Sequence, residues 1–139
     1  MHGKEENGFV ALKLDNGEDI YQCLHKAIEE FSIESGYILM GIGMLRDAEI
    51  GYFAGTEYLT KHLEQPHELV SLQGSISTKG ETIIHMHCNL AGPDHNIVGG
   101  HLNRGTVIVI NEILIKKLEN VQLGRNLNPE TGLKELYIQ

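Results

Sequence analysis

Four of the eight histidines in this 139-residue chain lie in one segment, residues 83–101, which reads IIHMHCNLAGPDHNIVGGH. In a β-strand, successive side chains point to opposite faces, so His85 and His87 would share one face about two residue rises apart. Two neutral imidazoles at this spacing can bind the same metal ion. Cys88 would point to the other face with the apolar residues of the segment, and we do not expect it to join the two histidines.

A third histidine follows after a short connection, NLAGPDHNIVGG. The Gly92-Pro93-Asp94 sequence and the Gly99-Gly100 pair are typical turn signals, and we expect them to bring the chain back to the histidine pair. Three protein ligands with a fourth position left for water are the pattern of catalytic zinc sites rather than structural ones. The sequence therefore predicts a site for Zn²⁺ or another divalent transition metal with three ligands: His85, His87 and His101.

Two alternatives remain open for these histidines. The three could instead form hydrogen bonds at a contact between subunits. His95, which follows Asp94 in the connection, could be a fourth ligand or simply a turn residue. The spacing of the histidines does not decide between these interpretations.

A metal-bound water could act as a nucleophile if a carboxylate accepted its proton. Glu68 and Glu112 are the candidates for this catalytic base, because each lies on a predicted strand; each could equally face solvent. The sequence has no Ser-His-Asp arrangement and no phosphate-binding loop. Gly41-Ile42-Gly43 lacks the third glycine and the following helix of a dinucleotide-binding motif.

The first half of the chain predicts a strand, a helix and further strands. FVALKLD alternates in hydrophobicity from residue 9 and ends at the turn signal Asp15-Asn16-Gly17. Apolar residues then recur at three- and four-residue steps, which predicts an amphipathic helix over residues 18–33. The apolar, glycine-punctuated segment 36–53 predicts two buried strands separated near Arg46-Asp47.

The second half predicts only strands. Residues 57–78 read as two strands around a turn at Gln65-Pro66, residues 82–92 as the histidine-bearing strand, and residues 104–118 as one or two more. The C-terminal tail, residues 120–139, is expected to supply a final edge strand. One helix and many strands indicate a single α+β domain over residues 1–139, with a mainly antiparallel sheet packed against the helix.

Composition limits the possible partners. The net charge of −8 disfavours a general phosphate-binding surface, because non-specific nucleic-acid affinity depends on Lys and Arg, and the eleven basic residues are scattered. A metal, a cationic group or another protein is therefore favoured. Cys23 and Cys88 show no CxxC spacing and are expected to be buried free thiols. The polar start MHGKEEN does not resemble a secretory signal and no apolar run is long enough to span a bilayer, so we expect a cytoplasmic protein.

The sequence also resembles a known family. HELVSLQGSIS followed by IIHMHCNLAGPDHNIVGGHL is similar to the Leu-x-Gly-Ser, HxHxxLAGxD and GGHL pattern of the plants-and-prokaryotes-conserved domain, called PPC or PCC. The earlier segment, LDNGEDIYQCLHKAIEEFSIESGYILMGIGMLRDAEIGYF, resembles the start of the same domain. The resemblance covers about residues 9–118 and is specific in its second half.

This resemblance implies a homotrimer of α+β domains with the histidine segment near the subunit contacts. In prokaryotic relatives, the histidines that match His85, His87 and His101 resemble a metal site, with zinc as the implied ion. In land plants the domain follows AT-hook motifs that bind A·T-rich DNA, which is the origin of its DNA-binding label. The sequence printed here has no such motif, since Arg104-Gly105 is not followed by Arg-Pro.

The sequence is therefore compatible with three functions. The first is a metal-binding homotrimer, the second a DNA-binding or regulatory protein, and the third a metal-dependent enzyme that acts on a small molecule.

Overall fold

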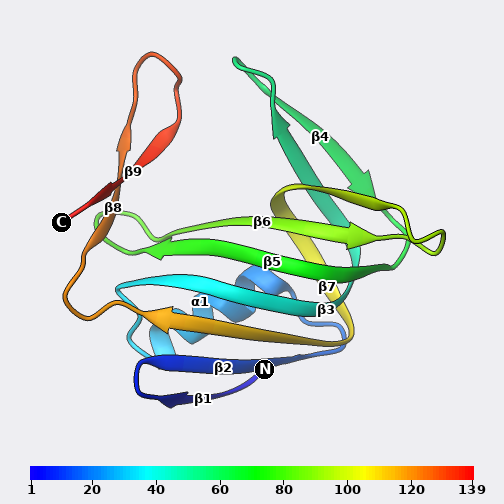
Figure 1. Cartoon of the computed structure of the whole chain (residues 1–139), viewed down its shortest axis with the longest axis horizontal. Coiled ribbons are helices and arrows are strands. Elements are labelled where there is room, and N and C mark those ends of the chain that lie inside the picture. Colours follow the sequence, from blue (N-terminus) through cyan, green and yellow to red (C-terminus); the bar gives the residue numbers. More distant parts are fainter.

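The computed structural model describes all 139 residues and has one helix, a seven-stranded antiparallel sheet and a separate two-stranded hairpin (Figure 1). In chain order the elements are β1 (His2–Glu6), β2 (Phe9–Asp15), α1 (Ile20–Glu30), β3 (Ser35–Phe53), β4 (Tyr58–Leu63), β5 (His67–Ser77), β6 (Ile83–Ala91), β7 (Ile97–Lys117), β8 (Leu123–Leu127) and β9 (Lys134–Ile138). The strand order in the large sheet is β1-β2-β7-β6-β5-β3-β4, with a further pairing between β7 and β3. The predicted α+β class is confirmed.

Helix α1 lies against one face of the sheet (Figure 1). Its apolar side chains belong to the hydrophobic core. The buried residues of the helix are Ile20, Cys23, Leu24, Ala27 and Ile28. The helix is shorter than the predicted 18–33 because it begins after the cap Asp19 and ends at Glu30, two residues before Ser32 adopts a positive φ of 50°. The only helix of the chain is not long and apolar enough to cross a membrane.

Asp19 determines where the helix starts. Its carboxylate accepts a hydrogen bond of 2.9 Å from the backbone N–H of Gln22, one of the amides that a helix leaves without an intrahelical acceptor. We expect Asp19→Ala to lower the free energy of unfolding by about 1 kcal/mol, measured by urea denaturation. Asp19→Asn keeps an acceptor oxygen and is the matched control, and an equal loss in both variants would contradict the capping role.

The prediction of two strands over residues 36–53 was wrong. Residues 36–53 were expected to form two strands, but β3 is continuous from Ser35 to Phe53. Its pairing with β7 shifts register at several points, and Asp47 has a positive φ of 49°. Such bulges bend a strand and increase its twist without ending it, which explains why the Arg46-Asp47 break does not separate two elements.

The prediction of a turn before His101 was also wrong. Gly99 and Gly100 were expected to form a turn before His101, but β7 already begins at Ile97 and both glycines lie inside the strand. A Cβ on Gly99 would lie 2.5 Å from the carbonyl oxygen of Cys88 in β6. A Cβ on Gly100 would lie 2.5 Å from the carbonyl oxygen of Gly51 in β3. The two glycines are needed because β7 runs closely between two neighbouring strands at this point.

The two long strands change partners along their length. Along one edge, β7 pairs with β6 over Ile97–His101 and with β2 over Ile110–Lys116. The other edge of β7 pairs with β3. β3 in turn pairs with β5, and β5 pairs with β6. The result is a closed ring of four strands, β7-β6-β5-β3, from which β2 and β1 extend on one side.

The ends of the chain also differ from prediction. The polar segment at the N-terminus forms β1, which pairs with β2 although its sequence lacks strand-like alternation. The C-terminal tail was expected to add an edge strand to the main sheet, but β8 and β9 pair only with each other. This hairpin is attached to the domain where the backbone N–H of Leu123 donates to the Oγ of Ser35 at 2.9 Å and an isolated bridge joins Lys79 to Gly124.

Both cysteines are free and buried, as predicted. Cys23 lies on α1 and Cys88 on β6. Burial raises the pKa of each thiol to about 11, so neither supplies a thiolate near neutral pH.

Candidate metal centre

The alternation along β6 places two histidines on one face of the sheet. Ile84 and Met86 are buried in the core, so His85 and His87 project from the opposite face. The register of the neighbouring strand then sets His101 of β7 directly across from His87. The prediction that Cys88 would point away from the two histidines agrees with its burial in the core.

The three rings converge. Their centroids are 5.1 Å apart for His85 and His87, 5.0 Å for His85 and His101, and 5.5 Å for His87 and His101. One potential ligand nitrogen from each ring lies within 4.8 Å of the others. Nitrogens in a tetrahedral zinc site lie about 3.4 Å apart, given Zn–N distances of about 2.0–2.1 Å, so side-chain adjustments of about 1 Å would let these rings ligate one ion.

Hydrogen bonding within the chain does not account for this cluster. The Nδ1 of His101 is buried and has no hydrogen-bond partner. The histidine side chains that do form hydrogen bonds in the chain are His62 and His67, both outside the cluster. A buried polar atom without a partner is costly, and binding a metal through this nitrogen is one way to offset that cost.

The surroundings also favour the neutral imidazoles that metal binding requires. Burial lowers the pKa of His85 to about 4, with smaller contributions from the positive charges that His101, Arg125 and His87 can carry. Burial, and then His87, likewise lower the pKa of His101. At neutral pH both rings therefore keep a free lone pair, and metal ions do not have to compete with protons for these two nitrogens.

A cavity of about 410 Å³ opens beside His85 and His101. Tyr58 of β4 contributes to one side, with its ring centroid 5.7 Å from that of His101. The C-terminal hairpin supplies much of the rest, including Arg125 and Leu136. Sequence reasoning missed Tyr58 and Arg125, since neither belongs to a motif and only the three-dimensional arrangement brings them to the histidines.

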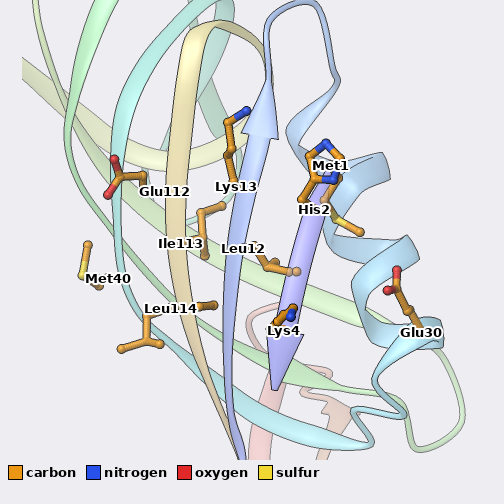
Figure 2. Close-up of a pocket in the computed structure, with 12 residues that line it drawn as sticks. Met1, His2, Lys4, Leu12, Lys13, Glu30, Met40, Glu112, Ile113 and Leu114 are labelled. Atoms are coloured by element: carbon orange, nitrogen blue, oxygen red, sulfur yellow. The ribbon is translucent and has the colours of Figure 1, made fainter. Parts of the chain in front are cut away.

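Neither predicted catalytic carboxylate lies near the cluster within one chain. Glu68 is exposed and pairs with Ala91, five residues along β5 from the residue that pairs with His87, or about 17 Å. Glu112 is exposed and eleven residues beyond His101 on β7. It lines a different cavity, of about 730 Å³, whose lining comes from β1, β2, β3, β7 and α1 (Figure 2). The geometry therefore gives neither residue a role at a metal-bound water of its own chain.

His95 adopts the turn conformation that was one of its two interpretations. It has a positive φ of 62° and its backbone N–H donates to the carbonyl of Gly92 at 2.9 Å. The side chain is exposed at the connection between β6 and β7, four ladder pairs beyond the His87–His101 pair. His95 is not part of the histidine cluster.

Several solved structures share this fold across nearly the whole chain. A protein of Archaeoglobus fulgidus described as metal-containing is 32% identical, with a TM-score of 0.85 over 96% of this chain and 95% of that one. A plant- and prokaryote-conserved protein of Pyrococcus horikoshii is 28% identical, with a TM-score of 0.83 over 96% and 93%. A candidate DNA-binding protein of Bacteroides thetaiotaomicron reaches a TM-score of 0.91 over 98% and 96%, but at 23% identity this likeness concerns the fold alone.

The sequence comparisons agree with the fold. A curated relative, the bifunctional protein GlmU of a Synechococcus strain, is 30% identical over 130 residues, or 92% of this chain. The chain spans only about a fifth of the length of that relative, 20%. The family model of the Plants and Prokaryotes Conserved (PCC) domain matches residues 1–119, which includes β1 and so extends beyond the expected range of 9–118. The chain belongs to the Plants and Prokaryotes Conserved domain family.

Proposed function

We propose that this protein is a zinc-binding, homotrimeric PCC-domain protein whose metal ligands are His85, His87 and His101. The observation that carries the proposal is the convergence of three imidazoles, one of which has a buried ring nitrogen without a partner in the chain. The all-nitrogen donor set suits zinc or a similar divalent ion. The metal-containing relative from Archaeoglobus fulgidus, at 32% identity, supports the same assignment.

The residues around the cluster favour binding over hydrolysis. A zinc ion at the triad would supply a Lewis acid at the edge of the 410 Å³ cavity. Glu135 is the carboxylate that lines this cavity, but its Oε1 already accepts hydrogen bonds from Asn128 and Thr131. A metal-dependent enzyme of small molecules would need a base that one chain does not place at the ion, so we rank this function below binding.

Metal analysis tests the proposal. Protein purified without a polyhistidine tag should contain about one zinc per chain by elemental mass spectrometry. Dialysis against a chelator should remove the ion and lower the melting temperature, and added zinc should restore both, because a ligand that binds only the folded state stabilises it. Protein that takes up no metal after dialysis against zinc would end this proposal.

Exposed apolar side chains on β3 and β5 support a contact between subunits. Ile42 is 43% exposed and Val70 is 49% exposed, and the register that pairs Gly43 with Leu69 sets them side by side. Apolar neighbours on an outer sheet face are typical of subunit contacts. We expect light scattering to give about three times the chain mass of 15.5 kDa.

A matched pair of variants locates this subunit contact. Ile42→Glu should shift the mass towards the monomer, because each contact would bury an unpaired carboxylate. Leu127→Glu, at a 65% exposed apolar position on β8, should leave the mass unchanged. A monomeric parent, or dissociation by both variants alike, would contradict the assignment.

DNA binding is a second candidate. Two solved structures with this fold, from Bacteroides thetaiotaomicron and Ralstonia eutropha, are described as candidate DNA-binding proteins, each at 23% identity. The net charge of −8 argues against it. Gel-shift titration with an A·T-rich duplex at about 0.15 M salt separates the candidates, since the metal-binding proposal expects no retention and the DNA proposal expects retention that weakens steeply with salt.

A further inference from the structure

Arg125 is the one arginine of this chain without a carboxylate partner. The other two arginines, Arg46 and Arg104, lie 3.7 Å from Asp47 and Glu49, respectively. Arg125 instead donates from one terminal nitrogen to the Oγ of Ser75 at 2.7 Å, and from the other to a backbone carbonyl at 3.3 Å. In a chain with nineteen acidic residues, a half-buried guanidinium surrounded by neutral oxygens is unusual.

The guanidinium retains unused donors inside the cavity. Arginine has five N–H groups, and only two of the Arg125 donors are accounted for by Ser75 and the carbonyl of Lys134. The Nε is buried without any acceptor. Burial lowers the pKa of Arg125, which reflects the cost of holding this charge out of water. One further hydrogen from each terminal nitrogen remains for a ligand.

The same cavity reaches the metal site. Both Arg125 and two of the proposed metal ligands, His85 and His101, line it. Three neutral histidines would leave the full charge of a divalent ion uncompensated, so the cavity would carry two centres of positive charge. The ammonium of Lys134 adds little to this, because it is already paired with the carboxylate of Glu81.

The remaining walls are largely apolar apart from Glu135, whose Oε1 already accepts hydrogen bonds from Asn128 and Thr131. Ile83, Leu133 and Leu136 face the cavity, and its volume of about 410 Å³ is within the range of small-molecule sites. Apolar walls strengthen the attraction between a fixed cation and an anion, because they exclude water. An anion with an apolar body satisfies both the charge and the walls.

We propose that Arg125 and the metal held by the histidine triad together bind a small organic carboxylate in this cavity. The planar guanidinium matches the two oxygens of a carboxylate, and the apolar walls take the hydrocarbon part of the ligand. This inference rests on the proposed metal site for its second positive centre. Arg125 lies in β8, outside residues 1–119 that the family model matches, so ligand choice comes from the C-terminal hairpin and not from the histidine motif.

Calorimetric titration of the zinc-loaded protein with benzoate tests the proposal, with benzamide as the neutral probe of the same shape. Benzoate should bind at least about tenfold more tightly than benzamide, as expected when a charge-assisted contact is lost. Arg125→Gln should weaken benzoate at least about tenfold, and Arg125→Lys should fall between this variant and the parent, since it keeps the charge but loses the planar fork. Arg104→Gln removes an arginine of the exposed surface and should change benzoate binding less than about twofold.

The zinc content and melting temperature of every variant are measured as well, so that loss of the anion site can be told apart from loss of metal or of folding. Unchanged zinc with weaker benzoate in Arg125→Gln supports the anion site. Equal benzoate affinity in Arg125→Gln and the parent overturns it, and loss of zinc in both Arg125 variants overturns it in favour of a role in supporting the triad. If the parent protein binds no metal, the proposed metal-binding function is contradicted, but the arginine site can still be tested. Benzoate binding by the metal-free protein that is lost in Arg125→Gln would then still support the arginine site, and no binding would overturn it.

Discussion

Replacing the three clustered histidines by alanine is expected to remove bound zinc almost completely, from about one ion per chain to less than about a tenth. Each lost imidazole removes one of only three protein ligands, and no carboxylate or thiolate of the same chain lies in the cluster to replace it. The chain should remain folded, because the three side chains project from the outer face while the core of β6 is made by Ile84, Met86 and Cys88. Elemental analysis and circular dichroism measure the two effects.

The control for this variant uses histidines that lie outside the cluster. His25, His62 and His95 are all exposed, and replacing them by alanine changes the histidine count by the same number. This control should keep its zinc. Equal loss of zinc from both triple variants would show adventitious surface binding, and retention of zinc by the cluster variant would place the metal elsewhere.

Gly100→Ala is expected to destabilise the protein strongly next to the histidine cluster. The new Cβ would lie 2.5 Å from the carbonyl oxygen of Gly51, and the residue has a φ of 156° that favours glycine. Because the contact is with backbone, β7 and β3 must separate, and we expect the free energy of unfolding to fall by about 3 kcal/mol. Urea denaturation measures this loss. His101 follows directly, so its displacement should also weaken zinc binding.

Gly55→Ala separates crowding from backbone strain. Gly55 has a positive φ of 97°, but nothing lies within 4 Å of the position of its Cβ. This control should cost about 1 kcal/mol and leave zinc affinity unchanged. If the two variants were equally stable, the close approach of β7 to β3 would not be a constraint on the fold.

The sequence predicted local elements better than their connections. The alternation of FVALKLD and IIHMHCNL identified β2 and β6, because each has one face in the core. The predicted break at Arg46-Asp47 was wrong because a bulged strand and two separate strands have the same local signals. The polar β1 had no alternation to detect, since its pairing with β2 depends on backbone hydrogen bonds rather than on apolar side chains.

Of the residues around the candidate metal centre, only the three histidines could be predicted from the sequence. Strand alternation brings His85 and His87 together without any knowledge of tertiary structure, and the connection between β6 and β7 is short enough to return His101. The predicted route of that return was wrong, since Gly99 and Gly100 permit close strand packing instead of a turn. Arg125 lies 24 residues beyond His101, on a hairpin with no motif, so nothing in the local pattern could have placed it in the cavity.

The position of β7 has a consequence for how the protein is made. This late strand pairs with β2 from the start of the chain, with β3 and with β6, so three segments depend on it for an edge partner or for closure of the ring. Such distant pairings carry a large loop-closure cost and form slowly. During synthesis, the edges of β2 and β3 that pair with β7 therefore stay unpaired until about residue 117 has left the ribosome. The nascent chain is prone to aggregation and to chaperone binding for most of its translation.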